Sequence, residues 1–507
     1  MSVKKLFGII YMSTTNLELM IVNLKTHEVL ERAASANFRQ DLDKSRIYQH
    51  ELDKIVFSLS GFAQLLKDYG VTRHCFWASQ QLIDDVTARY LSEQLFVRTG
   101  FQVRWLNTSQ INYYRALSLI GHTRTFGTLS GKTAYLLYIG SAAVTLFHFQ
   151  KQRFMQAWNI GLGHLEINRL AQALRTTAND PNEIIDDYIA SKLDYLKEDL
   201  AGKDGEDTAL ILQDNSALNN LYLPPDSRLT ELPLIKFREE LSSAVEASSQ
   251  YLLDRYHVEE SRVTRVVPGF LITRRLLRYT QANQLFLTRL NIMDGLAIQS
   301  GVDLGFTKHD YQSIIQTSAE NIARLYIMEK DHRELVTKFA LHIFDQTRKL
   351  HRLGPRERLL LSVASTIADI GNAISQHNHY HHSAYIMEAN PLTGLSDQEN
   401  RIIAEIARYH SAETPDAEQP HYRNLDPAIQ MPIAKLVAIL RLADALDDSH
   451  QQKISKLTVS LKENKLTLTV HSAQDLALEK WAFARKAKLF QEVYGLTPVL
   501  KQRRAAE

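Results

Sequence analysis

The chain has 507 residues, which is too many for a single hydrophobic core, so several domains are expected. Hydrophobic residues make up 45% of the chain and charged residues 23%, a composition that excludes a disordered polypeptide. The net charge of +2 is too small to indicate a nucleic-acid or membrane surface, so we expect neither DNA nor a membrane as a partner.

Cys75 is the only cysteine, which excludes an intrachain disulfide framework and any multi-cysteine zinc site and suits a reducing compartment. The first residues have too short an apolar run for a signal peptide, and no later run approaches the length of a membrane span. We therefore expect a cytoplasmic protein.

The N-terminal half contains an internal repeat. Residues 7–33 and 134–160 each predict three strands separated by two turns, from alternating apolar residues and β-branched or aromatic content. Tyr11 and Tyr138 occupy equivalent places in the two copies. Residues 51–70 predict an amphipathic helix that ends at a glycine. A triplet of strands followed by α/β units, present twice, is typical of the actin-like ATPase fold, in which two lobes face each other across a cleft.

From about residue 310, apolar residues recur three and four apart with almost no Gly or Pro, which predicts helices. Alternation returns from Leu457 as a predicted hairpin, followed by one more helix. We predict four domains. They are two α/β lobes at 1–127 and 128–305, a helical domain at 306–452 and a small C-terminal domain at 453–507.

Residues 377–382 read "HNHYHH", with four histidines in six positions. Neighbouring histidines in a loop bind metals adventitiously, whereas a selective site draws its ligands from separate elements. We predict a solvated loop, in which the pair His382-Ser383 is the part held in place.

Four motifs carry a family resemblance: "LNIMDGLAIQSG" at 290–301, "HSAYIM" at 382–387, "RYH" at 408–410 and "LRLADALD" at 440–447. In order and spacing they resemble the exopolyphosphatase / guanosine pentaphosphate phosphohydrolase (Ppx/GppA) family, essentially end to end. The resemblance implies duplicated actin-like (ribonuclease H-like) lobes, an all-α HD-like domain and a small α+β domain. It also implies hydrolysis of polyphosphate or pppGpp with Mg²⁺, often in a homodimer.

The resemblance also implies where phosphate is bound. The family's first hairpin, approximately D-x-G-S-N-S, falls on residues 11–16, and its second, D-I-G-G-G-S-T-E, falls on residues 138–145. Tyrosines replace both leading acids, and a tyrosine is a poor substitute for a carboxylate bound to Mg²⁺. The phosphate-binding residues implied by these turns, and by the family's "P-L-G", are Ser13, Thr14, Gly140, Ser141 and Gly161.

The family's catalytic base falls on or near Gln110, and its phosphate-binding arginine falls on Ile83. Glutamine orients water but does not accept its proton, and loss of a general base costs about 10²–10⁴-fold in rate. The hairpins are therefore either simple turns now, or part of a shifted active site that uses Gln110 and Thr145.

HD-type metal sites need a His, an adjacent His-Asp pair and a later Asp; by resemblance these fall on His332, Ala368-Asp369 and Asp444. Ala368 supplies no ligand, so we expect a structural hydrogen-bond network, with an occupied metal site as the alternative. A buried Asp444 needs a partner, for which Arg408, His410 and Arg441 are the candidates.

The predicted function is therefore that of an exopolyphosphatase-like protein with eroded catalytic motifs, which binds polyphosphate, a guanosine polyphosphate or a protein partner. Two alternatives stay open. One is an active exopolyphosphatase with relocated catalytic groups, and the other is a scaffold subunit that pairs with an active homologue.

Overall fold

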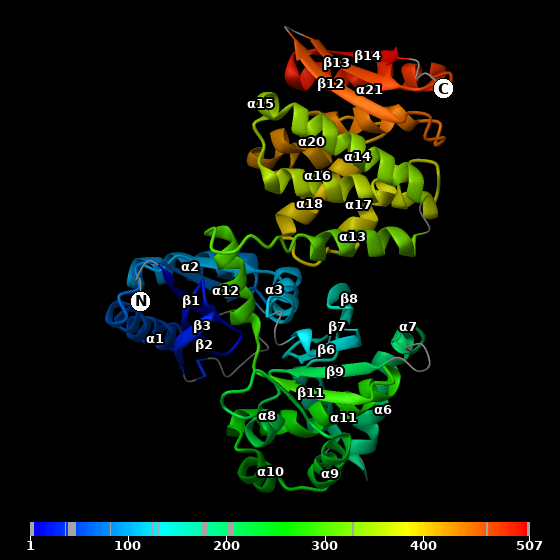
Figure 1. The fold of residues 1–507 in the computed structure, drawn as a ribbon. Helices are drawn as coiled ribbons and strands as arrows, with labels where there is room; N and C mark the ends of the chain where they lie inside the picture. Colours follow the sequence, from blue (N-terminus) through cyan, green and yellow to red (C-terminus); the bar gives the residue numbers. More distant parts are fainter. Residues whose placement is uncertain are drawn as a thin grey trace. The chain divides into compact units, whose positions relative to one another are not determined.

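The computed structural model describes residues 5–35, 37–38, 47–81, 83–122, 126–129, 131–174, 180–200, 207–326, 329–462 and 465–503. The chain forms two compact units, residues 1–311 and 312–507 (Figure 1). Each unit is described by itself.

The first lobe of the first unit contains a five-stranded sheet in the order β3-β2-β1-β4-β5. Its strands are β1 (Leu6–Met12), β2 (Leu17–Asn23), β3 (Glu28–Ala34), β4 (His74–Ser79) and β5 (Val103–Leu106). β1, β2 and β3 pair antiparallel, whereas β4 and β5 extend the sheet in parallel. The three antiparallel strands are the predicted triplet.

The described residues of this lobe also form the helices α1 (Gln49–Asp68), α2 (Asp85–Thr99), α3 (Thr108–Ile120) and, from much later in the chain, α12 (Ile292–Asp303). Apolar side chains of α12 share a buried cluster with residues of β1 and β2. The segment "LNIMDGLAIQSG" therefore returns the chain from the second lobe to the first.

The second lobe has a six-stranded sheet in the order β10-β11-β9-β6-β7-β8, in which β6, β7 and β8 form the second predicted triplet. The bounds of its strands are β6 Thr133–Ile139, β7 Val144–Gln150, β8 Arg153–Ile160, β9 Thr208–Gln213, β10 Leu229–Glu231 and β11 Gln284–Thr288. The bounds of its helices are α5 His164–Leu174, α6 Pro181–Leu193, α7 Lys197–Leu200, α8 Ser216–Tyr222, α9 Leu234–Val245, α10 Ser249–Tyr256 and α11 Val266–Tyr279.

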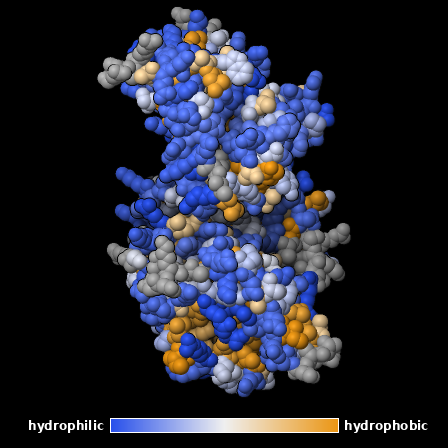
Figure 2. All heavy atoms as spheres, turned by 90° about the vertical axis from the view of Figure 1, so that its right-hand side faces the viewer, coloured by the Kyte–Doolittle hydropathy of each residue, from blue (hydrophilic) through white to orange (hydrophobic). Residues whose placement is uncertain are grey.

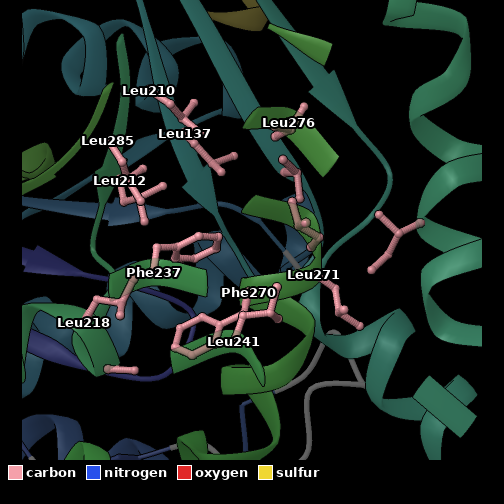
Figure 3. Packing of buried hydrophobic residues seen from close by; sticks show 14 of the residues in the cluster. Leu137, Leu210, Leu212, Leu218, Phe237, Leu241, Phe270, Leu271, Leu276 and Leu285 are labelled. Atoms are coloured by element: carbon pink, nitrogen blue, oxygen red, sulfur yellow. The ribbon is translucent and has the colours of Figure 1, made fainter. Parts of the chain in front are cut away.

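The core of the second lobe lies between the inner strands and helices α9 and α11. Leu137, Leu210, Leu212 and Leu285 extend from β6, β9 and β11 toward Phe237 and Phe270 (Figure 3). Burial of each such side chain stabilises the fold by roughly 1.5–3 kcal/mol. The predicted duplication of residues 7–33 and 134–160 is confirmed, and Tyr11 and Tyr138 are both the penultimate residues of their strands.

The second unit is a helical bundle with a small sheet. Its helices are α13 Ser313–Leu325, α14 Lys330–Gln346, α15 Arg348–His351, α16 Pro355–Ile367, α17 His379–Ala389, α18 Asp397–Tyr409, α19 Pro420–Arg423, α20 Pro427–Asp444 and α21 Ala477–Tyr494. The sheet contains β12 (Lys456–Lys462), β13 (Lys465–His471) and β14 (Thr497–Arg503). The predicted helices and hairpin are confirmed. Sequence analysis missed β14, which pairs in parallel with β13.

The prediction of a loop at 377–382 is wrong for most of its length. Only His377 and Asn378 precede α17, and His379 is the first residue of that helix. Asn378 adopts a left-handed conformation with φ 55°, which turns the chain into the helix. The last four residues of the run therefore lie on helical turns, not in a free loop.

The face of the molecule shown in Figure 2 is predominantly hydrophilic, and its hydrophobic residues gather in small groups. Within the described part of the chain, no helix combines the length and the apolar character needed to cross a bilayer.

A close approach of backbone segments holds the second hairpin in place. The amides of His164 and Leu165 donate to the carbonyl oxygens of Gly140 and Ser141, at 3.0 Å each. A Cβ on Gly163 would lie 2.2 Å from the Ser141 oxygen, whereas a Cβ on Gly161 would meet nothing within 4 Å.

We therefore expect Gly163→Ala to destabilise the first unit by about 1–3 kcal/mol, because the backbone must shift to admit the methyl group. Gly161→Ala is the matched control and should change the free energy of unfolding by less than about 1 kcal/mol. Urea unfolding of the full chain, followed by tryptophan fluorescence, measures both. Equal effects of the two substitutions would contradict this account of the turn.

Candidate functional site

A cavity of about 850 Å³ lies between the ends of β1, β6 and β9 and helices α3, α8, α11 and α12 in the first unit. Its lining contains both predicted hairpin turns, represented by Ser13, Thr14 and Ser141. The hydroxyl groups of Thr14 and Ser141 lie 3.5 Å apart. The two turns of the repeat thus meet at the mouth of one cavity.

Tyr11 and Tyr138 line this cavity, and so does the guanidinium of Arg115. Its Cζ atom is 3.2 Å from the centre of the Tyr138 ring, a cation–π contact. Burial raises the pKa of Tyr11 well above its ordinary value despite the nearby charge of Arg115, so the phenol is neutral. A neutral phenol does not replace a carboxylate as a cation ligand.

Arg115 comes from α3 and is only 4% exposed. Its Nη1 donates to Asp214 Oδ2 at 2.8 Å and to Gln213 Oε1 at 2.9 Å, both at the end of β9. Burial opposes the charge, but Tyr138, Asp214 and Tyr11 outweigh this effect and raise the pKa of Arg115. The cavity lining therefore contains a charged guanidinium that is held by an ion pair with Asp214.

The first hairpin turn uses its amide groups internally. The amides of Thr15 and Asn16 donate to the Ser13 hydroxyl at 3.3 and 2.9 Å, and the Ser13 amide donates to the Asn16 carbonyl at 2.8 Å. Three backbone donors that could hold a phosphate oxygen are thereby occupied. Any anion in this cavity would be bound mainly by side chains.

The cavity lining is rich in arginine. Besides Arg115 it contains Arg32, Arg228, Arg262, Arg265 and Arg289. Arg32 pairs with Asp294 at 3.3 Å, whereas Arg228 and Arg289 donate to backbone carbonyls.

Arg265 is the clearest candidate for an anion-binding group. It forms no ion pair with any residue that the structure describes, and burial and the neighbouring Arg262 lower its pKa. Arg262 pairs with Glu259 at 3.6 Å, and its Nη2 donates to the side-chain oxygen of Asn16 at 2.9 Å. A half-buried guanidinium beside another cation is stabilised by a bound anion.

The other predicted residues lie elsewhere. Gln110 caps the N-terminus of α3: its Oε1 accepts from the Asn107 amide at 3.2 Å, and it does not line the cavity. Ile83 is buried, and Gly140 and Gly161 are also absent from the lining. Sequence analysis missed Arg115, Arg262 and Arg265, because nothing in "YYRALS" or "ESRVTR" distinguishes a cavity arginine from a surface one.

The residues at this cavity do not fit the Mg²⁺ ion implied by the resemblance. The two strand-end positions carry neutral phenols, and Asp214 is already paired with Arg115. A divalent cation placed beside that guanidinium would be repelled by it. No step of a reaction is therefore derived through a metal here.

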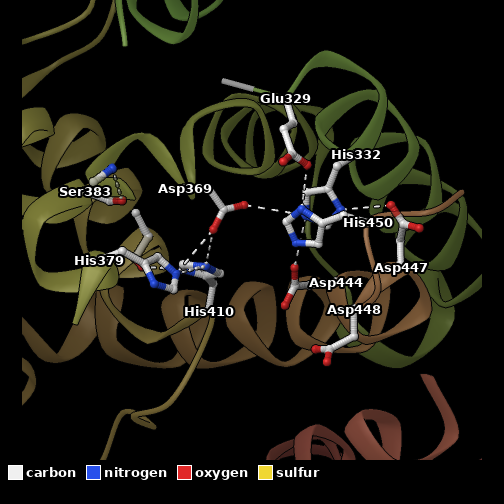
Figure 4. A network of polar contacts seen from close by, with 12 residues as sticks. Glu329, His332, Asp369, His379, Ser383, His410, Asp444, Asp447, Asp448 and His450 are labelled. Atoms are coloured by element: carbon white, nitrogen blue, oxygen red, sulfur yellow. Dashed lines mark hydrogen bonds and ion pairs between the residues drawn. The ribbon is translucent and has the colours of Figure 1, made fainter. Parts of the chain in front are cut away.

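In the second unit, His332 on α14 lies among three carboxylates, as Figure 4 shows. Its Nδ1 donates to Asp447 at 2.9 Å, and its Nε2 lies 3.6 Å from Asp369 and 3.7 Å from Asp444. Burial lowers the pKa of His332, but these carboxylates outweigh it and raise the pKa to about 12. The three HD-like residues thus converge around an imidazolium ion.

The partner of Asp444 was predicted wrongly. None of Arg408, His410 and Arg441 pairs with it; its closest cation is Lys486 of α21, which also lies 3.3 Å from Asp448. Burial raises the pKa of Asp444, but Lys486 and His332 outweigh this and lower it. Sequence analysis missed Lys486 because it lies beyond the hairpin, in what we had taken as a separate domain.

Comparison with known proteins agrees with this architecture. Residues 314–488 match the family model of Ppx/GppA phosphatase, domain III. The guanosine-5'-triphosphate,3'-diphosphate pyrophosphatase of Aliivibrio fischeri is 24% identical over 183 residues, which are 35% of this chain and 35% of that protein. The C-terminal region of the chain is thus similar to domain III of the Ppx/GppA phosphatases.

The alignment with that curated relative spans about a third of its length. An exopolyphosphatase from Cytophaga hutchinsonii has a similar crystal structure, with a TM-score of 0.50 and 14% identity over 59% of this chain and 98% of that chain. This likeness confirms the predicted fold class, duplicated actin-like lobes followed by a helical region.

His164 lines the cavity but contributes no charge to it. Burial, together with the positive charge of Arg265, lowers its pKa to about 3, from an ordinary value of 6.5. The unfolded chain binds a proton at this residue below about pH 6.5 whereas the folded chain does not, so its contribution to stability falls as the pH falls toward 3.

We therefore expect the free energy of unfolding of the first unit to drop less between about pH 7 and about pH 5 in His164→Asn than in the wild type. Tryptophan fluorescence suits the measurement, because three of the four tryptophans (Trp77, Trp105 and Trp158) lie in that unit. An unchanged slope would show that His164 is protonated in the folded chain.

Proposed function

We propose that the cavity of the first unit is a metal-independent binding site for a phosphate polyanion, and that it does not hydrolyse its ligand. The observation that carries the proposal is the position of Arg115. A buried guanidinium with two neutral tyrosines stands where the family resemblance implies carboxylates and a divalent cation.

The remaining cations supply the binding energy. Arg262 and Arg265 face the same cavity as the hydroxyl groups of Ser13, Thr14 and Ser141. Hydrogen bonds between a guanidinium and a phosphate are charge-assisted and worth about 1.5–3 kcal/mol each. The cavity's mouth is thus suited to a terminal phosphate.

The absence of hydrolysis follows from the acid–base groups at the cavity. A general base must reach the attacking water, and Asp214, the acid nearest the centre, is paired with Arg115. Gln110 is held in a helix cap by its Asn107 hydrogen bond. Glu18 also lines the cavity, and burial and Asp214 raise its pKa, so it is the carboxylate that the alternative of relocated catalytic groups would use as a base.

The ligand class follows from the relatives. One is a pyrophosphatase of a guanosine polyphosphate and another is an exopolyphosphatase. We propose inorganic polyphosphate or a guanosine polyphosphate as the ligand of this cavity. Because the cations are guanidiniums, binding should need no Mg²⁺ and should weaken with added salt.

The test is calorimetric titration of the full chain with polyphosphate and with pppGpp, in EDTA and in Mg²⁺. Arg265→Gln and Arg262→Gln should each weaken binding by about 10-fold or more, the equivalent of one lost charge-assisted hydrogen bond. Arg274→Gln is the matched control, because Arg274 pairs with Asp186 and does not line the cavity.

Phosphate release is measured on the same samples. We expect no turnover with either substrate, with or without Mg²⁺. Turnover near 1 s⁻¹, an ordinary enzymatic rate, would support relocated catalytic groups instead. If neither ligand binds and Arg265→Gln behaves like wild type, the scaffold alternative would gain support.

A gain-of-function variant tests the role of the central guanidinium. Tyr11→Asp and Tyr138→Asp together with Arg115→Ala replace two phenols by carboxylates and remove the competing charge. We expect this triple variant to bind Mg²⁺, and the double tyrosine variant that keeps Arg115 to bind it at least about 10-fold more weakly, because of charge repulsion. Isothermal titration with Mg²⁺ compares the two, and equal affinities would show that Arg115 does not exclude the metal.

A further inference from the structure

Asp369, His379 and His410 present three ligand atoms at one point in the second unit. Asp369 Oδ1 lies 3.1 Å from His410 Nε2 and 3.3 Å from His379 Nε2, and the two Nε2 atoms are 3.3 Å apart. The three atoms form a nearly equilateral triangle. Figure 4 shows Asp369 between this pair of histidines on one side and His332 on the other.

These separations are those of ligands that share a cation. A divalent cation with bonds of about 2.0–2.2 Å to nitrogen and oxygen places neighbouring ligand atoms about 3 Å apart. His332 Nε2 lies farther away from its carboxylates, at 3.6 and 3.7 Å. The tight triangle is therefore distinct from the imidazolium network around His332, although Asp369 belongs to both.

The two histidines are oriented as metal ligands are. His410 Nδ1 lies 2.6 Å from the carbonyl oxygen of Ala407, which only accepts, so this nitrogen carries the proton. His379 Nδ1 faces the Gln376 carbonyl in the same way, at 3.4 Å. Each Nε2 atom faces Asp369 Oδ1, so the two imidazoles either donate protons to this carboxylate or share a cation with it.

The backbone around Asp369 fixes the triangle. The turn Ile370–Ala373 packs so closely on α17 that a Cβ atom on Gly371 would lie 2.0 Å from the His379 carbonyl oxygen. The Gly371 amide donates to Ser383 Oγ at 2.9 Å. The "ADIG" and "HSAYIM" segments are thereby locked together, which brings Asp369 to the first turn of α17.

The site is built from separate elements and is open on one side. Asp369 precedes the turn Ile370–Ala373, His379 begins α17 and His410 follows α18. The side chain of His410 is 2% exposed, whereas those of Asp369 and His379 are 19% and 18% exposed. A cation would be reached from the side of His379 and would keep open positions for water.

We propose that Asp369, His379 and His410 bind one divalent transition-metal cation. Two imidazoles and one carboxylate favour Zn²⁺, Fe²⁺ or Mn²⁺ over the harder Mg²⁺ and Ca²⁺. His379 supplies the second imidazole, which the side chain of Ala368 is unable to supply. This site lies in the second unit and does not rest on the function proposed for the first.

The test uses full-length protein stripped with EDTA and titrated with Zn²⁺ and, separately, with Mn²⁺. We expect one equivalent of Zn²⁺ per chain by calorimetry and by metal analysis after dialysis, and a higher melting temperature of the loaded protein. Asp369→Asn, His379→Gln and His410→Gln should each lower the affinity by about 100-fold or more.

His377→Gln is the matched control, because His377 belongs to the same run of histidines but is exposed and outside the triangle. It should bind like the wild type. Circular dichroism of the stripped variants checks that each is folded, and His379→Gln is the least disruptive, since it changes the first residue of a helix.

Two results would overturn the proposal. In the first, the metal is chelated adventitiously by the histidines of residues 377–382. His377→Gln and His379→Gln would then lower the metal affinity equally, and Asp369→Asn and His410→Gln would not change it. If the folded wild type retains no Zn²⁺ and no Mn²⁺, then the two histidines are held together by a proton instead of a cation.

Discussion

The guanidinium of Arg115 is buried where strand ends of two lobes meet, and its charge must be satisfied there. It stacks on Tyr138 and bonds to Gln213 and Asp214 of the second lobe, while α3, which carries it, belongs to the first. One side chain of the cavity lining therefore links the two lobes. Removing a buried charge from such a pair leaves its partner unsatisfied and costs several kcal/mol in fully buried cases. The two tyrosines and the paired aspartate are consistent with this one fixed cation.

Much of the fold could be predicted from the sequence because strands and helices leave periodic patterns in neighbouring residues. Period-2 alternation and the equivalent positions of Tyr11 and Tyr138 indicated the duplicated strands, and helical periodicity indicated the bundle. β14 was missed because its strand character depends on its parallel partner β13, which precedes it by a whole helix. The site was harder to predict. Arg115 and Asp214 are 99 positions apart, and His379 and His410 are 31 apart. Alternation and periodicity carry no information on such pairs. His379 was missed as a ligand because the family pattern places the histidine at position 368, where this chain has alanine, and His379 lies one turn and one loop later.

The two candidate sites handle charge in opposite ways. The first unit places guanidinium groups around a cavity. These groups stay charged at any physiological pH and do not bind metal ions. The second unit gathers carboxylates and imidazoles, whose charge is balanced by His332, by Lys486 and, in our proposal, by a cation at Asp369. Phosphate recognition in the first unit is therefore separable in principle from divalent-metal chemistry in the second.

The contact between Lys486 and Asp444 has a consequence for where this chain can be divided. Lys486 lies on α21, which follows the hairpin, and yet it supplies the positive charge for a buried carboxylate at the end of α20. The family-model match ends at residue 488, just beyond it. A fragment cut at 452, between helices and hairpin, would leave Asp444 without that cation and expose the apolar face on which α21 lies. The last fifty residues thus complete the helical core, and we expect the bundle and the small sheet to unfold together.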